Sequence, residues 1–193
     1  MRIGIVSDIH CQIDALALAL ERMGPIDRLL VLGDVIDEAR FSAETVRMLR
    51  QRDAIAIRGN HDAMFLEGPG AAARRGRVAE QDDLAWLAGL PERHMLTVEG
   101  RRLQMVHATS WPSDYAYVTP NHRLFPRFAE SEADIILYGH THEPVVGELD
   151  GKLIVNPGSI GHGRPTATGF IRSFALLDLP EGAARIEDLP PVN

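Results

Sequence analysis

Five short polar segments of the sequence, each following a run of apolar residues, hold seven side chains that can bind divalent metal ions. These side chains are Asp8, His10, Asp34, Asn60, His107, His140 and His142. Carboxylates, neutral imidazoles and an amide oxygen suit borderline divalent ions such as Mn, Fe, Co, Ni or Zn, whereas calcium takes more oxygen ligands. Five of the eight histidines lie in these segments, and this concentration indicates metal chemistry.

The apolar runs before these segments have the length and composition of β-strands. They are residues 2–6, 29–32, 54–57, 103–106 and 135–137. Sites in α/β proteins are built where strands end. Because residues i and i+2 of an extended segment face the same side, Asp8 and His10 are expected to grip one ion. His140 and His142 are expected to repeat that geometry. Two closely spaced cations need a bridging carboxylate, and Asp34 is the natural candidate.

In the first half of the chain, predicted strands and helices alternate. In the second half, most of the predicted elements are strands. Helical spacing predicts a helix at 13–23, and Ser42 is a plausible N-cap for a helix that ends at residue 51. Residues 63–81 are rich in Gly and Ala and predict a loop or weak helix near the site, followed by a short helix at 82–89. Three strand pairs are predicted further on, 95–98 with 102–106, 145–149 with 153–155, and 174–177 with 185–187.

Composition narrows the class of protein. At 193 residues and 45% hydrophobic content, the chain fits a single domain, 1–193. A formal charge of -7 argues against binding of a nucleic-acid backbone. A single cysteine, Cys11, excludes an internal disulfide and a thiolate zinc cluster. No basic leader or apolar run of about 18 residues is present, so a cytoplasmic protein without a membrane segment is expected.

The segments, in this order, resemble the motifs of the calcineurin-like metallophosphoesterase superfamily, D-x-H, G-D-x-x-D, G-N-H-D, H and G-H-x-H. The sequence Asn156-Pro157-Gly158-Ser159 is similar to the small bacterial and archaeal phosphodiesterase branch. The resemblance implies an α/β (α+β) fold, a four-layer αββα sandwich in which two mixed β-sheets pack face to face with helices outside.

The resemblance also implies roles for the individual residues. One metal would take Asp8, His10 and His142, the other Asn60, His107 and His140, and Asp34 would bridge both. His61 would protonate the leaving-group oxygen, with Asp62 holding its ring. Asp37 would support the Asp34 loop or a ligand histidine. Two divalent transition metal ions are implied, Mn first, with Fe, Zn, Co or Ni as alternatives.

The expected reaction is in-line attack of a metal-bridging hydroxide on phosphodiesters or nucleotide phosphoanhydrides. The expected partner is a small phosphorylated substrate, nucleotides included, and a homodimer is expected by analogy with similar small members. Two other functions stay open: a phosphoprotein or phosphomonoester phosphatase, and a non-enzymatic metal-binding scaffold such as the superfamily's retromer subunit. The complete set of ligands argues against the scaffold.

Residues that would contact substrate lie in the loops 63–81 and 109–127, which should rim the cleft. Asn60 is one candidate. Arg164 could bind a phosphate oxygen or be a surface arginine. Trp111 and Tyr115 could stack on a base, although packing of the loop is the favoured interpretation. Cys11 is expected to be a small apolar filler rather than a redox-sensitive thiol. The remaining histidines are set aside, and only His162 is a candidate to approach the site.

Overall fold

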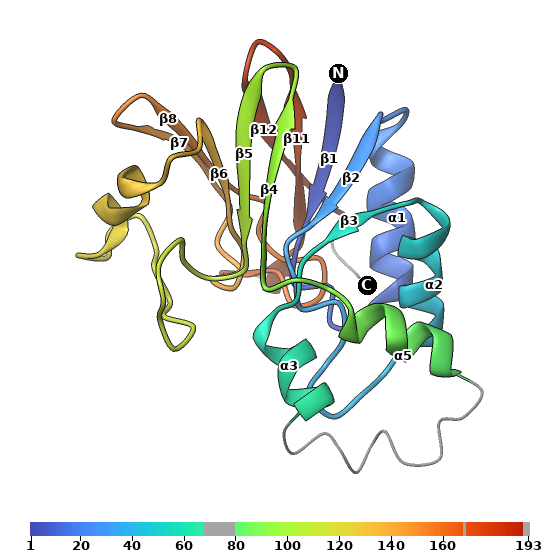
Figure 1. Ribbon diagram of the computed structural model, residues 1–193. Coiled ribbons are helices and arrows are strands. Elements are labelled where there is room, and N and C mark those ends of the chain that lie inside the picture. The colour runs from blue at the N-terminus through green and yellow to red at the C-terminus, as the bar shows by residue number, and fades with distance from the viewer. Residues whose placement is uncertain (68–79, 168, 191–193) are drawn as a thin grey trace.

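Two five-stranded mixed β-sheets form the centre of the molecule, in a computed structural model that describes residues 1–67, 80–167 and 169–190. The first sheet has the order β12-β11-β1-β2-β3 and the second β4-β5-β6-β8-β7. Figure 1 shows the two sheets side by side, with the loops that follow β1, β2 and β5 gathered at one end.

The first sheet consists of β1 (Arg2–Val6), β2 (Arg28–Val31), β3 (Ile55–Ala56), β11 (Ser173–Asp178) and β12 (Ala183–Asp188). Strands β1, β2 and β3 run parallel to one another, and β11 pairs antiparallel with β1. The parallel strands therefore end at the same edge of the sheet.

The second sheet repeats this arrangement with β4 (Arg93–Val98), β5 (Arg101–Val106), β6 (Ile135–Leu137), β7 (Val145–Leu149) and β8 (Lys152–Asn156). Its central strands β5, β6 and β8 are parallel, and hairpins add β4 and β7 at the edges. Each sheet thus brings three parallel strands to the end where the polar segments begin.

Alternation along the strands explains why the sheets stack. Ile3 and Ile5 of β1 meet Leu103 and Met105 of β5 in the core between the sheets. Val6 points the other way, toward the helices. Burial of both faces accounts for the almost continuous apolar character of the central strands.

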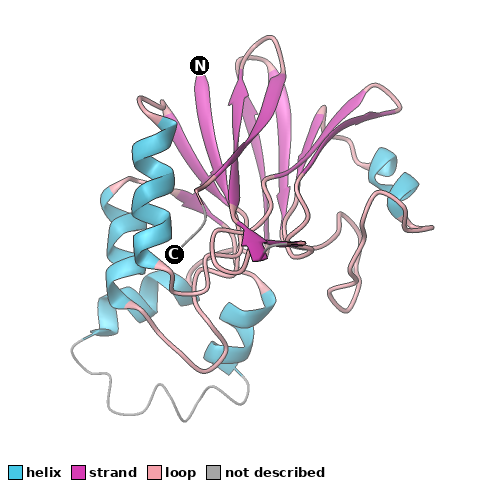
Figure 2. Cartoon of the chain, turned by 180° about the vertical axis from the view of Figure 1, so that it is seen from behind, coloured by secondary structure: helices cyan, strands magenta, loops and turns pink. Residues whose placement is uncertain are grey.

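Helices cover the outer face of the first sheet. They are α1 (Ile13–Met23), α2 (Ala43–Gln51) and α5 (Gln81–Ala88), which Figure 2 shows packed along one side of the molecule. The outer face of the second sheet packs instead against a long connection that contains the 3-10 helix η2 (Phe125–Glu130). The four-layer order of the expected fold is confirmed, with an irregular fourth layer.

Most of the predicted elements are present, and η2 and two short strands were not expected. Helix α3 (Asn60–Glu67) begins at the metal-ligand segment itself, so the start of the segment 63–81, predicted as a loop or weak helix, is helical. Residues 68–79 of that loop lie outside the described residues. A separate hairpin of β9 (Arg164–Thr166) and β10 (Gly169–Ile171) was not expected. Among the described residues, no helix has the length and apolar character needed to cross a bilayer.

Candidate metal centre

The seven expected metal ligands lie on loops at the carboxyl ends of both sheets. Asp8 and His10 follow β1, Asp34 follows β2, Asn60 begins α3 after β3, His107 follows β5, and His140 and His142 follow β6. The first sheet thus supplies four of the side chains and the second supplies three. The site forms where the two sheets meet.

The backbone at these loops is not extended. Asp8, His10, Asp34, His140 and His142 all have positive φ, between 48° and 65°. The expectation that alternation on an extended segment aims Asp8 and His10 at one ion was therefore wrong, although both side chains do reach the site. Left-handed backbone is costly outside glycine and clusters at functional sites. Backbone bonds hold it here, including His10 N–H to the Asp34 carbonyl at 3.1 Å.

Close approach of the loops requires glycine at two positions. A Cβ at Gly33, where φ is 92°, would lie 2.7 Å from Nδ1 of His107. A Cβ at Gly139 would overlap Ser7 and lie 2.9 Å from a carboxylate oxygen of Asp8. Both glycines let a loop of one sheet touch a ligand held by the other sheet.

Asp34 lies between the two halves of the centre. Its Oδ2 is 3.4 Å from Nε2 of His107 and 3.9 Å from Nε2 of His10. Its Oδ1 accepts the backbone N–H of His61 at 2.8 Å. The side chain is almost fully buried. One carboxylate oxygen between two imidazoles on opposite sides is the arrangement that a bridging ligand needs.

Hydrogen bonds fix which ring nitrogen of each histidine faces the centre. Nδ1 of His107 lies 2.7 Å from the Leu32 carbonyl and donates to it, which leaves Nε2 facing Oδ1 of Asn60 at 3.0 Å. Nε2 of His140 donates to the Tyr115 carbonyl at 2.8 Å, so Nδ1 remains free to bind a cation. Such outer partners orient metal-binding imidazoles.

Asp8, His10 and His142 form the other half of the candidate metal centre. Oδ1 of Asp8 lies 3.2 Å from Nε2 of His142, and Oδ2 accepts the backbone N–H of His140 at 3.0 Å. The His10 ring is buried, and among the described residues neither of its nitrogens has a hydrogen-bond partner. Buried polar atoms without partners are costly. A cation would satisfy them, so the residues present fit a metal ion.

Charge in the centre also favours a cation. Burial lowers the pKa of His10 to about 4, which keeps its ring neutral and able to bind a metal. For His107, burial acts in the same direction, but the negative charges of Asp34 and Asp8 outweigh it and raise the pKa to about 10. The two carboxylates thus attract positive charge, which a divalent ion can supply in place of protons.

The environment of His61 differs from the expected one. Nδ1 of its ring lies 3.4 Å from Oδ1 of Asp37 and 3.9 Å from Oε2 of Glu38. Asp37 thus faces His61 rather than a ligand histidine, and its Oδ1 also accepts the backbone N–H of Glu38 at 2.9 Å, within the loop that follows Asp34. The ring of His61 packs edge-on against that of His10, with centroids 4.8 Å apart.

Asp62 does not hold the His61 ring, and that expectation was wrong. Its buried carboxylate accepts the backbone N–H groups of Gly59 at 2.9 Å, Ile36 at 3.0 Å and Val35 at 3.3 Å. Burial, together with the charge of Asp34, raises the pKa of Asp62 to about 7 despite these bonds. The side chain ties the start of α3 to the loop after β2.

Comparison with known proteins agrees with this geometry. Residues 1–182 match the calcineurin-like phosphoesterase superfamily domain. The chain belongs to this superfamily. An uncharacterized protein of Methanocaldococcus jannaschii is 26% identical over 174 residues, which is 82% of this chain and 69% of that protein.

Solved structures give the same result. The metallophosphoesterase of Sphaerobacter thermophilus is 26% identical, with a TM-score of 0.75 over 98% of this chain and 89% of that one. A hypothetical protein of Pyrococcus horikoshii OT3 shares the fold, with a TM-score of 0.80 at 16% identity over 97% of this chain and 87% of that one. Membership in the superfamily supports a divalent-metal-dependent phosphate-ester hydrolase.

Two residues considered as candidate substrate contacts are engaged elsewhere in this calcineurin-like phosphoesterase. The guanidinium of Arg164 makes two bonds to Asp188, at 2.9 and 2.8 Å. The Trp111 ring packs 5.1 Å from Phe128, and the guanidinium carbon of Arg127 lies 4.5 Å from its centroid. Trp111 therefore packs the connection between β5 and β6, which was the favoured interpretation from the sequence.

Tyrosines form an aromatic rim at the metal centre. The Tyr115 ring lies 6.1 Å from that of His107, and the Tyr117 ring lies 4.0 Å from that of His140. Tyr117 is 64% exposed. Both rings thus lie next to expected metal-ligand histidines. Cys11 is buried within the core beside α1, as expected of an apolar filler, and burial raises the pKa of its thiol.

His162 is the residue that sequence reasoning undervalued. Its ring centroid lies 4.2 Å from that of His10 and 5.4 Å from that of His142. The sequence signal was its place between Gly161 and Gly163, just after the Asn-Pro-Gly-Ser turn. A histidine between glycines can reach a site that the backbone approaches closely.

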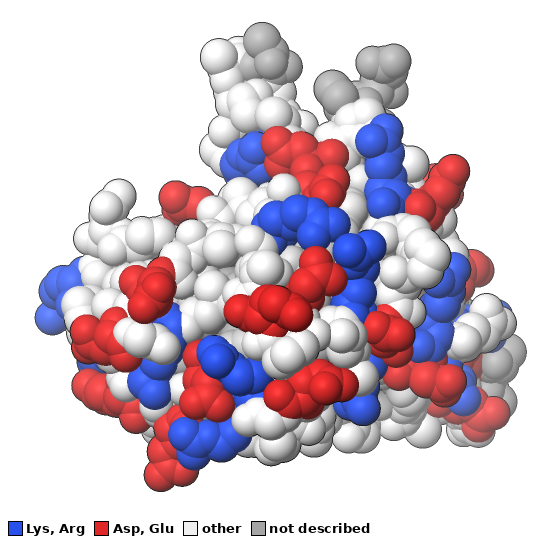
Figure 3. All heavy atoms as spheres, turned by 90° about the horizontal axis from the view of Figure 1, so that it is seen from above, with Lys and Arg blue, Asp and Glu red and all other residues white. Residues whose placement is uncertain are grey.

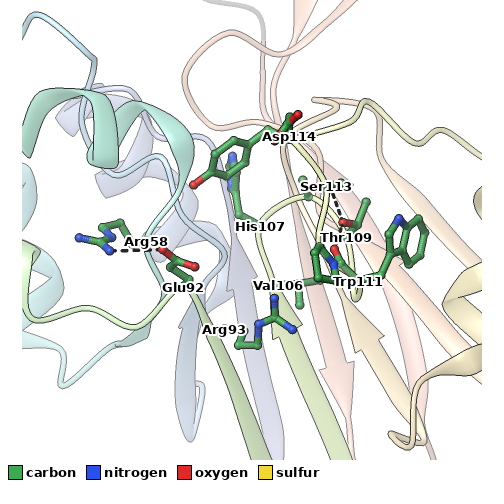
Figure 4. Close-up of a pocket in the computed structure, with 12 residues that line it drawn as sticks. Arg58, Glu92, Arg93, Val106, His107, Thr109, Trp111, Ser113 and Asp114 are labelled. Atoms are coloured by element: carbon green, nitrogen blue, oxygen red, sulfur yellow. Dashed lines mark hydrogen bonds and ion pairs between the residues drawn. The ribbon is translucent and has the colours of Figure 1, made fainter. Parts of the chain in front are cut away.

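A cavity of about 500 Å³ opens beside His107. Figure 4 shows Arg58 and Glu92 on one wall, and Thr109, Trp111 and Ser113 on the other. Arg93 lies at its base. The volume is within the range of small-molecule sites. Charged, hydroxyl and apolar groups line the same space.

Proposed function

We propose that this chain is a dinuclear-metal phosphoesterase that hydrolyses phosphodiesters or nucleotide phosphoanhydrides. Asp8, His10 and His142 would hold one ion, Asn60, His107 and His140 the other, and Asp34 would touch both. Manganese is the proposed metal because the donors are mixed oxygen and imidazole nitrogen. When bound, the two cations supply Lewis acidity that activates water and polarises the phosphoryl group.

His61 is proposed as the general acid. Its backbone N–H is fixed on Asp34 at 2.8 Å, which holds the residue at the edge of the centre. As a general acid the ring would carry a proton on each nitrogen: the one on Nδ1 would face Oδ1 of Asp37, 3.4 Å away, and the one on Nε2 would pass to the leaving-group oxygen. Proton transfer matters most for alkoxide leaving groups, which are too basic to depart as anions.

The cavity beside His107 is the observation that carries the choice of substrate class. A phosphodiester, or a phosphoanhydride attacked at an internal phosphorus, has a second substituent on the reacting phosphorus besides the leaving group, and this substituent needs space next to the metals. The cavity of about 500 Å³ offers that space beside His107, one of the proposed metal ligands. Its mixed lining supports a substituent with both rings and hydrogen-bonding groups, as in a nucleotide.

The test compares hydrolysis of bis-p-nitrophenyl phosphate and p-nitrophenyl phosphate. Protein stripped with a chelator would be assayed before and after addition of Mn²⁺. We expect Mn²⁺-dependent turnover with a clear preference for the diester, lost in Asp34→Asn and retained in His94→Ala. His94 lies on β4 outside the metal-ligand clusters and serves as the matched control.

Two results would contradict the proposal. Preference for the monoester would favour a phosphomonoester or phosphoprotein phosphatase. Binding of two metal ions without turnover of either ester or of a nucleotide panel would favour a metal-binding scaffold.

A further inference from the structure

We propose that His162 is an additional protein ligand of the metal ion held by Asp8, His10 and His142. The inference rests on the proposed metal centre and adds to it a residue outside the motifs of the superfamily. It makes the two metal sites unequal, because only one of them would have an extra imidazole.

The three histidine rings surround one point. His10, His142 and His162 each offer a nitrogen, and these atoms all lie within 4.8 Å of one another. Metal–imidazole bonds are about 2.1 Å long, so two nitrogens on opposite sides of one ion are about 4.2 Å apart. To share an ion, the rings would have to draw in by about half an ångström where two nitrogens lie on opposite sides of it, and by more where they lie at a right angle.

The backbone that carries His162 is fixed against the loop of Asp8. Gly161 N–H donates to the Asp8 carbonyl at 2.7 Å, and the Ser159 hydroxyl donates to the same oxygen at 2.9 Å. The Ser159 hydroxyl also accepts the N–H of His162 at 3.0 Å. The segment 159–162, which includes His162, is thus hydrogen-bonded to the loop that carries the metal ligand Asp8.

The two glycines beside His162 allow this approach. A Cβ at Gly161 would lie 2.8 Å from the carbonyls of Asp8 and Ile9 and 2.9 Å from Cβ of His10. Gly163 has a φ of 69°, and a Cβ there would meet the Ile171 carbonyl at 2.6 Å. Side chains on either neighbour would push the ring of His162 away from the centre.

The His10 ring, whose nitrogens lack hydrogen-bond partners, marks where the metal ion would bind. Both nitrogens of the buried His10 ring are without a hydrogen-bond partner among the described residues. His162 is exposed, and its ring has no hydrogen bond or ion pair within the part of the chain that the structure describes. An exposed imidazole without partners, next to a buried one without partners, fits a coordination position at the solvent side of the ion.

The test measures metal binding without substrate. Chelator-stripped wild type, His162→Ala, His162→Gln, His61→Ala and His94→Ala would be titrated with Co²⁺ and followed by calorimetry and the visible absorption of the bound ion. We expect wild type to bind two ions. His162→Ala should weaken one of them at least tenfold and change its spectrum, while the other ion keeps its affinity. His61→Ala and His94→Ala should bind both ions as wild type does.

Equal affinities and spectra for wild type and both His162 variants would overturn the inference while leaving the dinuclear centre in place. If these variants instead raised only the KM for the diester, His162 would be a substrate contact and not a ligand. If wild type bound no metal, the proposed function and this inference would both be wrong. Circular dichroism of each variant ensures that a lost ion does not reflect a lost fold.

Discussion

His61 is held at the edge of the metal centre by its backbone and faces Asp37 through its ring. If it donates a proton, its importance should depend on how basic the leaving group is. We expect His61→Ala to lower kcat by about 10²- to 10⁴-fold for an alkyl phosphodiester. The loss should be much smaller for bis-p-nitrophenyl phosphate, whose leaving group departs as an anion.

The measurement is the ratio of kcat values for the two substrates in each variant. Asp37→Asn, which keeps the shape of the side chain and removes its charge, should show a weaker version of the same pattern. An equal loss on both substrates would mean that His61 acts by binding the substrate rather than by protonating it.

Asp62 contributes to stability, since its carboxylate accepts three backbone N–H groups in a fully buried position. Asp62→Ala leaves these donors unsatisfied, so we expect a loss of about 3 kcal/mol in the free energy of unfolding. Asp62→Asn keeps one acceptor oxygen and should lose less. Urea denaturation followed by circular dichroism gives both values. An unchanged midpoint with reduced kcat would return Asp62 to the role of orienting His61.

One buried carboxylate joins helices α2 and α5. Asp83 of α5 is 3% exposed, and it accepts from Nε of Arg47 at 2.8 Å and Nη1 of Arg50 at 2.5 Å, both on α2. We expect Asp83→Asn to cost about 1 to 2 kcal/mol, because the half-exposed arginines can recover water.

The matched control for the ion pairs of Asp83 is the exposed pair of Arg127 and Glu130, which are 42% and 63% exposed. Glu130→Gln should change stability by less than about 0.5 kcal/mol, as exposed pairs do. Urea denaturation midpoints of Asp83→Asn and Glu130→Gln test this difference in stability. Similar midpoints would mean that the buried ion pairs of Asp83 add no more stability than an exposed pair.

Local signals in the sequence were sufficient for most elements. Ser42 was expected to cap α2, and its hydroxyl accepts Thr45 N–H at 3.1 Å. The predicted pairing of 145–149 with 153–155 is present as β7 and β8, which the Asp150-Gly151 turn joins. For residues 63–81 the sequence left a loop and a weak helix open, because the apolar periodicity is short, and the first residues of α3, beginning at Asn60, were interpreted only as ligands.

The candidate site was predictable in its residues but not in its geometry. The order of motifs pointed to the ligand side chains, whereas the left-handed backbone at Asp8 and His10 has no local signal, since neither residue favours positive φ as glycine does. The carboxylate next to His61 was misassigned for a related reason. Asp62 is adjacent to His61 in the sequence, but its side chain points into the protein. Asp37 reaches the His61 ring from another loop.

The net charge of the chain, -7, does not favour binding of a long polyanion. On the face seen in Figure 3, which is opposite the metal-ligand loops, Lys and Arg alternate with Asp and Glu. The expected homodimer stays a prediction, which light scattering coupled to gel filtration tests directly.

Metal binding should stabilise the whole fold, because its ligands come together only in the native state. At a concentration 100 times the Kd, an ion adds about 2.7 kcal/mol to the free energy of unfolding. We therefore expect the Tm of stripped protein to rise on addition of Mn²⁺, and to rise much less in Asp34→Asn. Differential scanning fluorimetry with and without a chelator measures the shift. A Tm that does not respond to Mn²⁺ would contradict the proposed centre.

The division of the ligands between the two sheets has a consequence for how the chain unfolds. Asp8, Asp34 and Asn60 belong to one sheet, and His107 and His140 to the other. An ion shared by both sets acts as a cross-link between sheets that are otherwise joined by apolar packing. Separation of the sheets must release the ion first. A bound metal should therefore slow unfolding far more than it speeds folding, and protect the chain kinetically.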